Sequence, residues 1–536
     1  MKFPIRLIAS VVALALCSPV PAQEPTIDVQ RFEIEGDNPL GAERTAAILS
    51  AHVGPARTLN QLEDAALALE KALQDEGQPF HRVLIPAQKP AQGAVVLQIV
   101  HFTLSEVEIE GNEHFSNENI RRSLPALVEG RAPDLRAIGR DLTAANSHPS
   151  KNVQLTFREG RAPDTLAAGL KVRDVDPIAI FSSLNFHRRI EDHDNRDSTY
   201  RFALGIQHSN LFDRDHVATL SYTTDLRPGR VSETTLLGAF YQMPLLGSGR
   251  SVSAYYTYSD VSSGRVQQGG SSVDVAGSGE FWGLRVTQAL PRIDVLQQSL
   301  SAAIDFKHFD NKTTLSNLGV VQPLGSDTGS RPLSLRYVLR ADIEPMSIGG
   351  SIEYAWNTGG GIGNDRAAYL RDGNDFHWDA WRATLDFSRL VANWTVMARA
   401  RGQWSGDPLI SGEQFGLGGT GSVRGFRDRE VSGERGYQVT LEAIGPGISQ
   451  YALQPVLFMD FGSIYLRPRN NDPAQVSARE GMLSAGVGLR WNWQRKLDLS
   501  LDLAHVFDGR RDVPNQITAS TQSGDNRLHL GLFYRF

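Results

Sequence analysis

A glycine-dense stretch, residues 416–427, holds the side chain best suited to specific chemistry. The stretch reads Gly-Leu-Gly-Gly-Thr-Gly-Ser-Val-Arg-Gly-Phe-Arg, and its glycines permit tight backbone turns around Arg424. A planar guanidinium can bind a carboxylate through two parallel hydrogen bonds. The stretch therefore predicts a loop that presents Arg424 to a carboxylate, and an ordinary surface loop is the alternative. The residues at the tip are Val423, Arg424, Gly425 and Phe426.

A matching carboxylate lies farther along the chain, in a segment of alternating polarity. One face of this segment is apolar, with Leu457, Met459 and Phe461. The opposite face carries Phe458, Asp460 and Gly462. Because successive side chains of a strand point to opposite faces, Asp460 is expected on the polar side of a β-sheet.

The segment at 481–491 adds small side chains to that polar face, namely Ser484, Gly486 and Gly488. Such residues leave room for another part of the chain to pack against the sheet. We therefore expect the loop to fold inward and Arg424 to pair with Asp460. Three other acidic residues remain alternative partners: Glu442, Asp498 and Asp502.

Motifs of enzymes and cofactor sites are absent from the sequence. It contains no His-Glu-x-x-His, Walker or Gly-x-Ser-x-Gly motif. Gly416, Gly418 and Gly421 fit a Gly-x-Gly-x-x-Gly pattern, but that pattern binds dinucleotides only between a strand and a helix. We therefore predict neither enzyme activity nor a cofactor.

Composition restricts the partners further. The 54 Lys and Arg residues are outnumbered by 60 Asp and Glu, and no long basic run occurs, which argues against nucleic acid. One cysteine excludes a disulfide framework and a Cys-based zinc site. Two acidic clusters could hold a cation, but solvated charged loops are the favoured interpretation, so no metal is predicted. They are Asp192, His193, Asp194 and Asp197, and Asp372, Asn374 and Asp375.

The elements that must position Arg424 and Asp460 begin after a predicted signal peptide, residues 1–22. Lys2 and Arg6 precede an apolar stretch that ends at Cys17, and small residues follow at the predicted cleavage site. A lipid anchor on Cys17 is the alternative, disfavoured by the bulky Leu16.

Two similar units follow, at residues 27–101 and 102–175. Ile34-Glu35-Gly36 of the first recurs as Ile109-Glu110-Gly111 in the second. Each pattern predicts the order β-α-α-β-β. Thr58 and Gln61 have the spacing of a capping box before a helix, and Gly77 suits its C-terminal end.

Residues 176–536 alternate apolar and polar side chains between clusters of turn residues, in sixteen predicted antiparallel strands. The connections after odd-numbered strands are long, notably 404–434, and those after even-numbered strands are short. No later window holds 18 consecutive apolar residues. The pattern predicts a transmembrane β-barrel with a wet interior, and a soluble all-β protein is the alternative.

The last strand gives the sharpest evidence for a barrel. Its apolar residues alternate with His529, Gly531, Phe533 and Arg535, and the chain ends on an aromatic residue. Free chain ends are usually frayed and polar, so an apolar strand at the end is unusual for a soluble protein. The outward residues are Leu528, Leu530, Leu532, Tyr534 and Phe536.

These motifs resemble those of the Omp85 superfamily, and in particular the TpsB-type outer-membrane transporters of two-partner secretion. The Val-Arg-Gly-Phe tip and the Phe-x-Asp-x-Gly strand match the loop and wall motifs of that superfamily in order. The two units resemble polypeptide-transport-associated (POTRA) domains. The first unit carries the motif Gly77-x-Pro79-x-x-Arg82-Val83-x-Ile85-Pro86-x-Gln88. The second unit carries Asn146-x-x-Pro149 followed by Gly160. The resemblance implies α+β periplasmic domains, a 16-stranded barrel in the bacterial outer membrane, and contact between Arg424 and Asp460.

The resemblance also implies a function and its partners. The periplasmic domains would receive an unfolded secreted exoprotein, and the barrel would pass it to the cell surface. Outer-membrane lipid and lipopolysaccharide would surround the barrel. The barrel-assembly machinery would recognise Tyr534 and Phe536 as the signal for assembly. A barrel-assembly insertase is the alternative, whereas a passive porin does not explain the two periplasmic units. Many relatives plug the pore with an N-terminal helix, for which residues 23–26 leave no room.

Overall fold

The computed structural model describes most of the chain between Thr26 and Phe536. The described ranges are 26–88, 92–191, 198–226, 235–260, 263–268, 271–310, 314–317, 320–323, 327–448, 452–467, 478–494, 496–509 and 520–536. The predicted signal peptide, Cys17 and the acidic residues of 192–197 lie outside them. The described residues include no helix of the length and apolar character needed to cross a membrane.

The contacts of the chain define two compact units. One contains the chain up to Glu108 with Ala126–Gly139 and Thr156–Gly169. The other contains Ile109–Pro125, Arg140–Leu155 and Leu170–Phe536. Residues of the second repeat therefore occur in both units.

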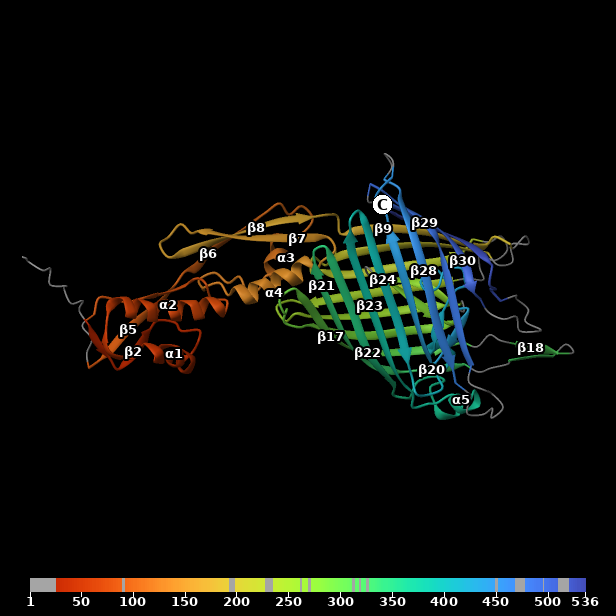
Figure 1. Ribbon diagram of the computed structural model, residues 1–536, viewed down its shortest axis with the longest axis horizontal. Helices are drawn as coiled ribbons and strands as arrows, with labels where there is room; N and C mark the ends of the chain where they lie inside the picture. The colour runs from red at the N-terminus through yellow and green to blue at the C-terminus, as the bar shows by residue number, and fades with distance from the viewer. Residues whose placement is uncertain are drawn as a thin grey trace, which may run out of the picture. The chain divides into compact units, whose positions relative to one another are not determined.

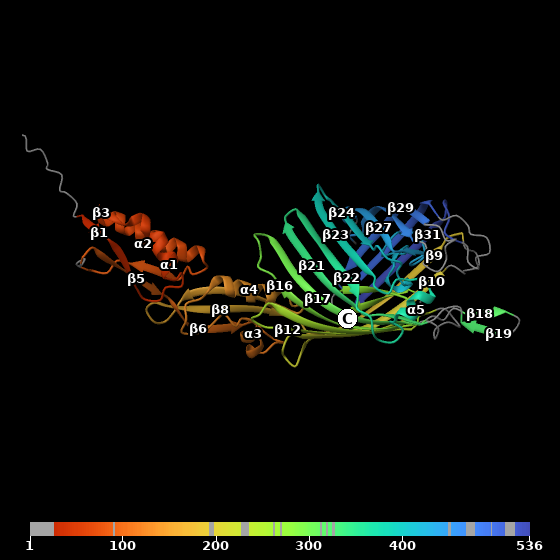
Figure 2. The same cartoon turned by 90° about the horizontal axis from the view of Figure 1, so that it is seen from below.

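The first repeat, residues 27–101, forms a three-stranded sheet covered by helices (red and orange in Figures 1 and 2). Its sheet has the order β2-β5-β4, with β2 parallel to β5, and β1 pairs separately with β3. The small β1–β3 sheet was not predicted, because strands of three and four residues carry too little alternation to be recognised. The elements are β1 Ile27–Val29, β2 Arg31–Glu35, α1 Ala42–Leu49, η1 Ser50–His52, β3 Gly54–Arg57, α2 Leu59–Asp75, β4 His81–Leu84 and β5 Ala94–His101.

Helix α2 begins and ends as the sequence predicts. Thr58 accepts a hydrogen bond from the Gln61 amide while the Gln61 side chain accepts one from the Thr58 amide, which completes the capping box. After the helix, Gly77 has φ +86°, and the Gln78 amide donates to the Leu73 carbonyl at 2.9 Å. This is the Schellman arrangement that favours glycine. The turn delivers the chain to the start of β4.

The second repeat has the predicted β-α-α-β-β order and the sheet order β6-β8-β7. Helix α3 starts three residues before its predicted start at Ile120, because Ser116 caps it through the Asn119 amide. The elements are β6 Thr103–Glu110, α3 Asn117–Ser123, α4 Leu135–Asn146, β7 Lys151–Glu159 and β8 Thr165–Asp174.

The remaining chain closes into an antiparallel barrel of sixteen strands, as predicted (Figure 1). The short β20 and the adjoining β21 both pair with β17 and together make one of the sixteen. Strand β31 pairs with β9 from Arg527↔Arg189 to Arg535↔Phe181, which closes the cylinder. The strands are β9 Ile178–Arg189, β10 Ser198–Leu211, β11 His216–Asp225, β12 Thr235–Leu245, β13 Arg250–Ser259, β16 Gly279–Ala289, β17 Leu296–Phe309, β20 Thr328–Ser330, β21 Pro332–Ile343, β22 Met346–Asn357, β23 Asp379–Val391, β24 Trp394–Trp404, β27 Arg435–Ile444, β28 Gln454–Leu466, β29 Ala478–Trp493, β30 Leu497–Asp508 and β31 Asn526–Arg535.

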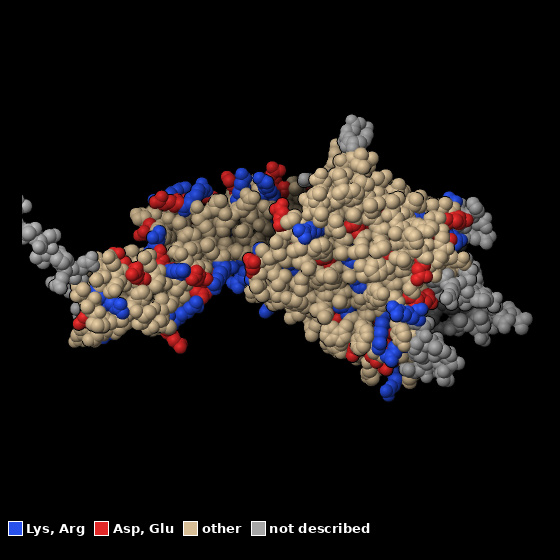
Figure 3. Space-filling model, in the orientation of Figure 1, with Lys and Arg blue, Asp and Glu red and all other residues tan. Residues whose placement is uncertain are grey.

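The barrel has an apolar outside and a polar inside. In β30, Leu503 is 41 % exposed on the outer face, whereas the neighbouring Asp502 is 7 % exposed and points inward. The face of the barrel seen in Figure 3 is correspondingly poor in charged residues. An apolar outer band with polar residues inside is the pattern of a barrel in lipid.

The connections alternate in length, as the sequence predicts. Residues 344–345 join β21 to β22 and residues 392–393 join β23 to β24, whereas residues 358–378 and 405–434 form long connections at the other end. Several strands are longer than predicted, including β29, since the ladder continues beyond the apolar alternation. Two hairpins in the long connections were not predicted: β14 Ser263–Gln268 with β15 Ser271–Ala276, and β18 Thr314–Asn317 with β19 Val320–Pro323.

Within the unit that holds the barrel, a buried ion pair joins β7 to the turn between β10 and β11. Lys151 Nζ lies 2.6 Å from Asp215 Oδ2, and both side chains are almost fully buried. Asn119 and Ser123 of α3 accept further hydrogen bonds from Lys151. The buried ammonium of Lys151 is therefore compensated by a carboxylate and by further acceptors, as a buried ion pair requires.

Candidate functional site

The connection between β24 and β27, residues 405–434, folds into the barrel. It contains the turn η2 Ser411–Glu413 and a hairpin of β25 Phe415–Leu417 with β26 Val431–Gly433. Val423 and Phe426 at its tip are 0 % and 1 % exposed. These residues are therefore part of a core and not of a solvated surface loop.

Apolar packing attaches the loop to one side of the lumen. Val423 and Phe426 cluster with Ile464 of β28, Met482 of β29 and Val506 of β30. Leu417 and Val431 of the hairpin belong to the same cluster. Burying these side chains removes apolar surface from water, which favours the inward position of the loop.

Arg424 binds Asp460 through the two parallel hydrogen bonds that the sequence suggests. Nε donates to Oδ2 at 2.6 Å, and Nη2 donates to Oδ1 at 2.9 Å. The Arg424 backbone amide also donates to Oδ2 at 3.1 Å. Arg424 is 4 % exposed and Asp460 is 0 % exposed, so water screens this pair little.

Two of the alternative carboxylates also face Arg424. Nη1 donates to Glu442 Oε1 at 2.6 Å and lies 3.5 Å from Asp502 Oδ2. The Phe458 ring stacks against the guanidinium, with 3.6 Å from Cζ to the ring centroid. Asp502 is in turn bound by Arg490 at 2.6 Å. The sequence presented Glu442 and Asp502 as alternatives to Asp460, but the structure brings all three to one guanidinium.

The adjacent Gly425 is held by the last strand, an interaction that the sequence analysis missed. Its amide donates to His529 Nε2 at 3.0 Å, and its carbonyl accepts from Arg527 Nε at 3.0 Å. His529 Nδ1 lies 3.0 Å from His187 Nδ1 of β9, across the closure of the barrel. In the sequence, the only indication of this contact is that His529 alternates with outward-facing leucines and therefore faces the lumen. Its partner could not be read from that pattern.

The glycines of the wall and of the loop tip differ in what they make room for. A Cβ on Gly462 would lie 3.0 Å from Leu417 of the loop, and one on Gly425 would lie 2.9 Å from Val506. A Cβ on Gly486 would lie 2.5 Å from the Phe458 ring, and one on Gly488 would lie 2.1 Å from the Asp502 carboxylate. Gly486 and Gly488 therefore admit the side chains that surround Arg424, and not the loop itself.

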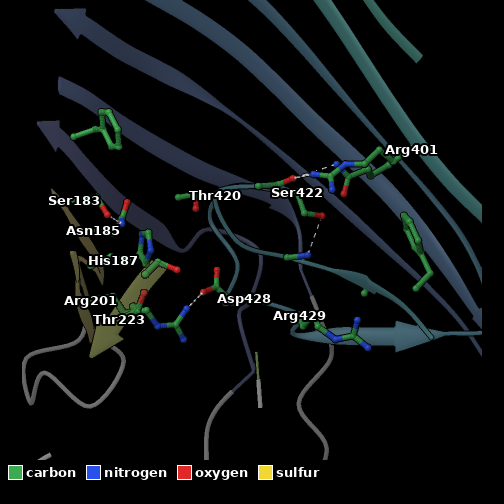
Figure 4. Close-up of a pocket in the computed structure, with 18 of the residues that line it drawn as sticks. Ser183, Asn185, His187, Arg201, Thr223, Arg401, Thr420, Ser422, Asp428 and Arg429 are labelled. Carbon is green, nitrogen blue, oxygen red and sulfur yellow. Dashed lines mark hydrogen bonds and ion pairs between the residues drawn. The ribbon is translucent and has the colours of Figure 1, made fainter. Parts of the chain in front are cut away.

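Further ion pairs attach the loop to other parts of the wall. Glu413, 2 % exposed, binds Lys307 of β17 at 2.9 Å and Arg382 of β23 at 2.8 Å. On another side, Arg201 of β10 binds Asp428 at 2.9 Å (Figure 4). The loop thus spans the lumen between strands that lie far apart around the barrel.

A cavity of about 460 Å³, lined by both polar and apolar side chains, remains beside the loop. Figure 4 shows Arg201 and Arg401 projecting into this region from the wall, and Thr420, Ser422 and Asp428 facing it from the loop. Arginine, amide and hydroxyl groups around an open space can solvate a polar backbone or water.

The other motifs singled out in the sequence have these positions in the structure. Gly416, Gly418 and Gly421 are followed by turns and β26, so the described chain lacks the strand–helix context of a dinucleotide site. The amides of Asp372 and Asn374 donate to the Tyr369 carbonyl, at the end of α5 Arg366–Arg371. Tyr534 lies near the end of β31 and Phe536 directly follows the strand. Their ring centroids are 4.6 Å apart, and Phe536 is 65 % exposed.

Sixteen strands around a lumen spanned by an arginine-bearing loop, preceded by two β-α-α-β-β repeats, define a transporter of the Omp85 superfamily. Residues 183–491 match the family model of the haemolysin secretion/activation protein ShlB/FhaC/HecB, and residues 27–101 match the ShlB-type POTRA domain. The chain belongs to the ShlB/FhaC/HecB family. It is a two-partner secretion transporter of the outer membrane, as the resemblance implied.

Individual relatives agree with this family. The outer membrane transporter CdiB of Dickeya dadantii is 21 % identical over 505 residues, covering 88 % of this chain and 82 % of that protein. The solved structure of CdiB from Escherichia coli has a TM-score of 0.69 at 16 % identity, over 98 % of this chain and 93 % of that one. CdiB from Acinetobacter baumannii has a TM-score of 0.66 at 17 % identity, over 96 % of this chain and 91 % of that one. The structural likenesses support the fold.

Proposed function

We propose that the loop of residues 405–434 closes the resting pore and that separation of Arg424 from Asp460 opens a path for an unfolded secreted exoprotein. The observation that carries this proposal is the two-bonded, buried contact between the loop tip and the barrel wall. The cavity beside the loop, into which Arg201 and Arg401 project, supports a path that water can enter. Transport along such a path needs no covalent chemistry, and we propose no enzyme activity.

The two repeats are the proposed receptors for the exoprotein, with boundaries at 27–101 and 102–175. Strand β4 is an edge of its sheet and exposes Leu84, which is 49 % exposed. An edge strand has unpaired backbone groups to which an extended polypeptide can add as another strand. A secreted protein that is still unfolded supplies such a segment.

Photo-crosslinking in the native cell tests the proposed recognition. A photoreactive amino acid in place of Leu84 is expected to capture one large secreted protein, which mass spectrometry identifies. The matched control is the same amino acid at Leu441, which is 38 % exposed on the outer face of β27 and should capture no exoprotein. Recovery of many different outer-membrane barrel proteins at position 84 would contradict dedicated export and support a barrel-assembly insertase.

We further propose that residues 1–22 are a signal peptide and that residues 176–536 form a barrel surrounded by lipid and lipopolysaccharide. Tyr534 and Phe536 are the proposed signal for the barrel-assembly machinery. The exposed ring of Phe536, directly after β31, supports this role, since an assembly factor could bind it before the barrel closes.

Deletion of Phe536 should reduce the amount of folded barrel in the outer membrane to a small fraction of the wild-type amount. The measurement is the heat-modifiable band on gels of isolated outer membranes. Phe507→Ala removes an exposed aromatic ring from the neighbouring β30 and is the matched control. Equal losses in the two variants would mean that Phe536 contributes only ordinary contacts.

A further inference from the structure

Three metal-ligating side chains converge in the first repeat, remote in sequence from Arg424. They are Asp37, His81 and His101, and one potential ligand atom of each lies within 4.8 Å of the others. His81 opens β4 and His101 ends β5, and the two residues are directly paired across the ladder. Their rings are therefore neighbours on one face of the sheet, with centroids 5.5 Å apart.

A glycine brings the carboxylate to the histidines. Gly36 follows β2 with φ +95°, and a Cβ there would lie 2.2 Å from the Ile99 carbonyl of β5. The chain can approach β5 this closely only without a side chain. The next residue, Asp37, consequently lies beside the end of β5 that carries His101.

His81 is the unusual member of this cluster. It is 1 % exposed, and neither of its ring nitrogens has a hydrogen-bond partner among the described residues. Buried polar atoms are almost always paired, because a buried group without a partner has lost its hydrogen bonds to water and gained none in return. An imidazole with both nitrogens unpaired therefore points to a ligand that supplies the missing interaction.

We propose that Asp37, His81 and His101 bind one divalent transition-metal ion of the Zn²⁺ class. Two imidazoles and a carboxylate are suitable ligands for Zn²⁺, whereas Ca²⁺ and Mg²⁺ prefer oxygen ligands.

The cluster can reach metal-binding geometry with small movements. Bonds of about 2.0–2.2 Å in a tetrahedral site place ligand atoms roughly 3.3 Å apart, closer than the present 4.8 Å limit. Asp37 is exposed and His101 is partly exposed, so both can rotate toward His81. Water would complete the coordination, and the ion would join the ends of β2, β4 and β5.

Zinc titration of the full-length protein tests this site. Chelator-treated protein in detergent should bind Zn²⁺ in isothermal titration calorimetry. Asp37→Asn and His101→Gln should each weaken that binding by at least about tenfold, the loss that even outer partners of metal ligands cause. His114→Gln is the matched control, because His114 is exposed and outside the cluster, and it should leave the affinity unchanged.

A second measurement guards against misfolding and against binding by other histidines. Zn²⁺ should slow hydrogen exchange of the β4 and β5 amides in the wild type but not in Asp37→Asn, whose altered side chain is exposed. Unchanged Zn²⁺ affinity in both Asp37→Asn and His101→Gln would overturn the proposal. Absence of Zn²⁺ binding by the wild type would also overturn it. Neither outcome depends on the export function.

Discussion

Arg424→Ala should reduce export of the exoprotein by about tenfold or more while leaving a folded barrel in the membrane. Removing one member of a buried ion pair leaves the other charge without compensation, at a cost of about 3–5 kcal/mol. Here the uncompensated group would be Asp460, which is 0 % exposed. The loop should then lose its defined position on the wall, whereas the sixteen-strand ladder, to which Arg424 does not belong, should persist.

The measurement is the amount of exoprotein released from cells that carry each variant, normalised to the heat-modifiable barrel. Arg399→Ala is the matched control. It removes an arginine that also pairs with an aspartate, Asp386, but both of these side chains are about half exposed, so little stability depends on the pair. Arg424→Lys should recover only part of the export, because an ammonium group cannot reproduce the two-bonded fork. Wild-type export by Arg424→Ala would remove this residue from the functional site.

Deletion of residues 416–430 should raise the single-channel conductance of the barrel in planar lipid bilayers severalfold. The deleted segment includes Arg424, which binds β28, and Asp428, which binds β10. It also includes the apolar residues Val423 and Phe426. Without it, the cavity beside the loop would become continuous with the space that the loop now fills. A wider aqueous path carries a larger ionic current.

The matched control for that deletion is removal of residues 264–275, most of the β14–β15 hairpin. Its two strands pair only with each other among the described strands, so the barrel ladder is unaffected. This control should leave the conductance close to that of the wild type. If the deletion of 416–430 also left the conductance unchanged, the loop would not be the barrier in the resting pore.

Patterns that extend over only a few residues of the sequence predict much of this fold. Alternation with a period of two, enforced by lipid outside and water inside, predicts all sixteen strands of the barrel. The Thr58–Gln61 capping box and Gly77 set the two ends of α2 through interactions within a few residues. The arginine-bearing tip and the inward Asp460 were recognisable for the same reason, because residue type and strand parity suffice to identify them.

Tertiary structure decided what those residues contact. Strand parity puts Glu442, Asp460, Asp498 and Asp502 on one face, but only the closed barrel determines that three of them surround Arg424. Likewise, Gly425 meets His529, Lys151 meets Asp215, and His81 approaches Asp37 only after distant segments have packed. The alternation of apolar and polar residues and the capping of helices act over a few residues, so both can be recognised in the sequence. The partner of a buried charge depends on the register and closure of the whole sheet, which no local pattern encodes.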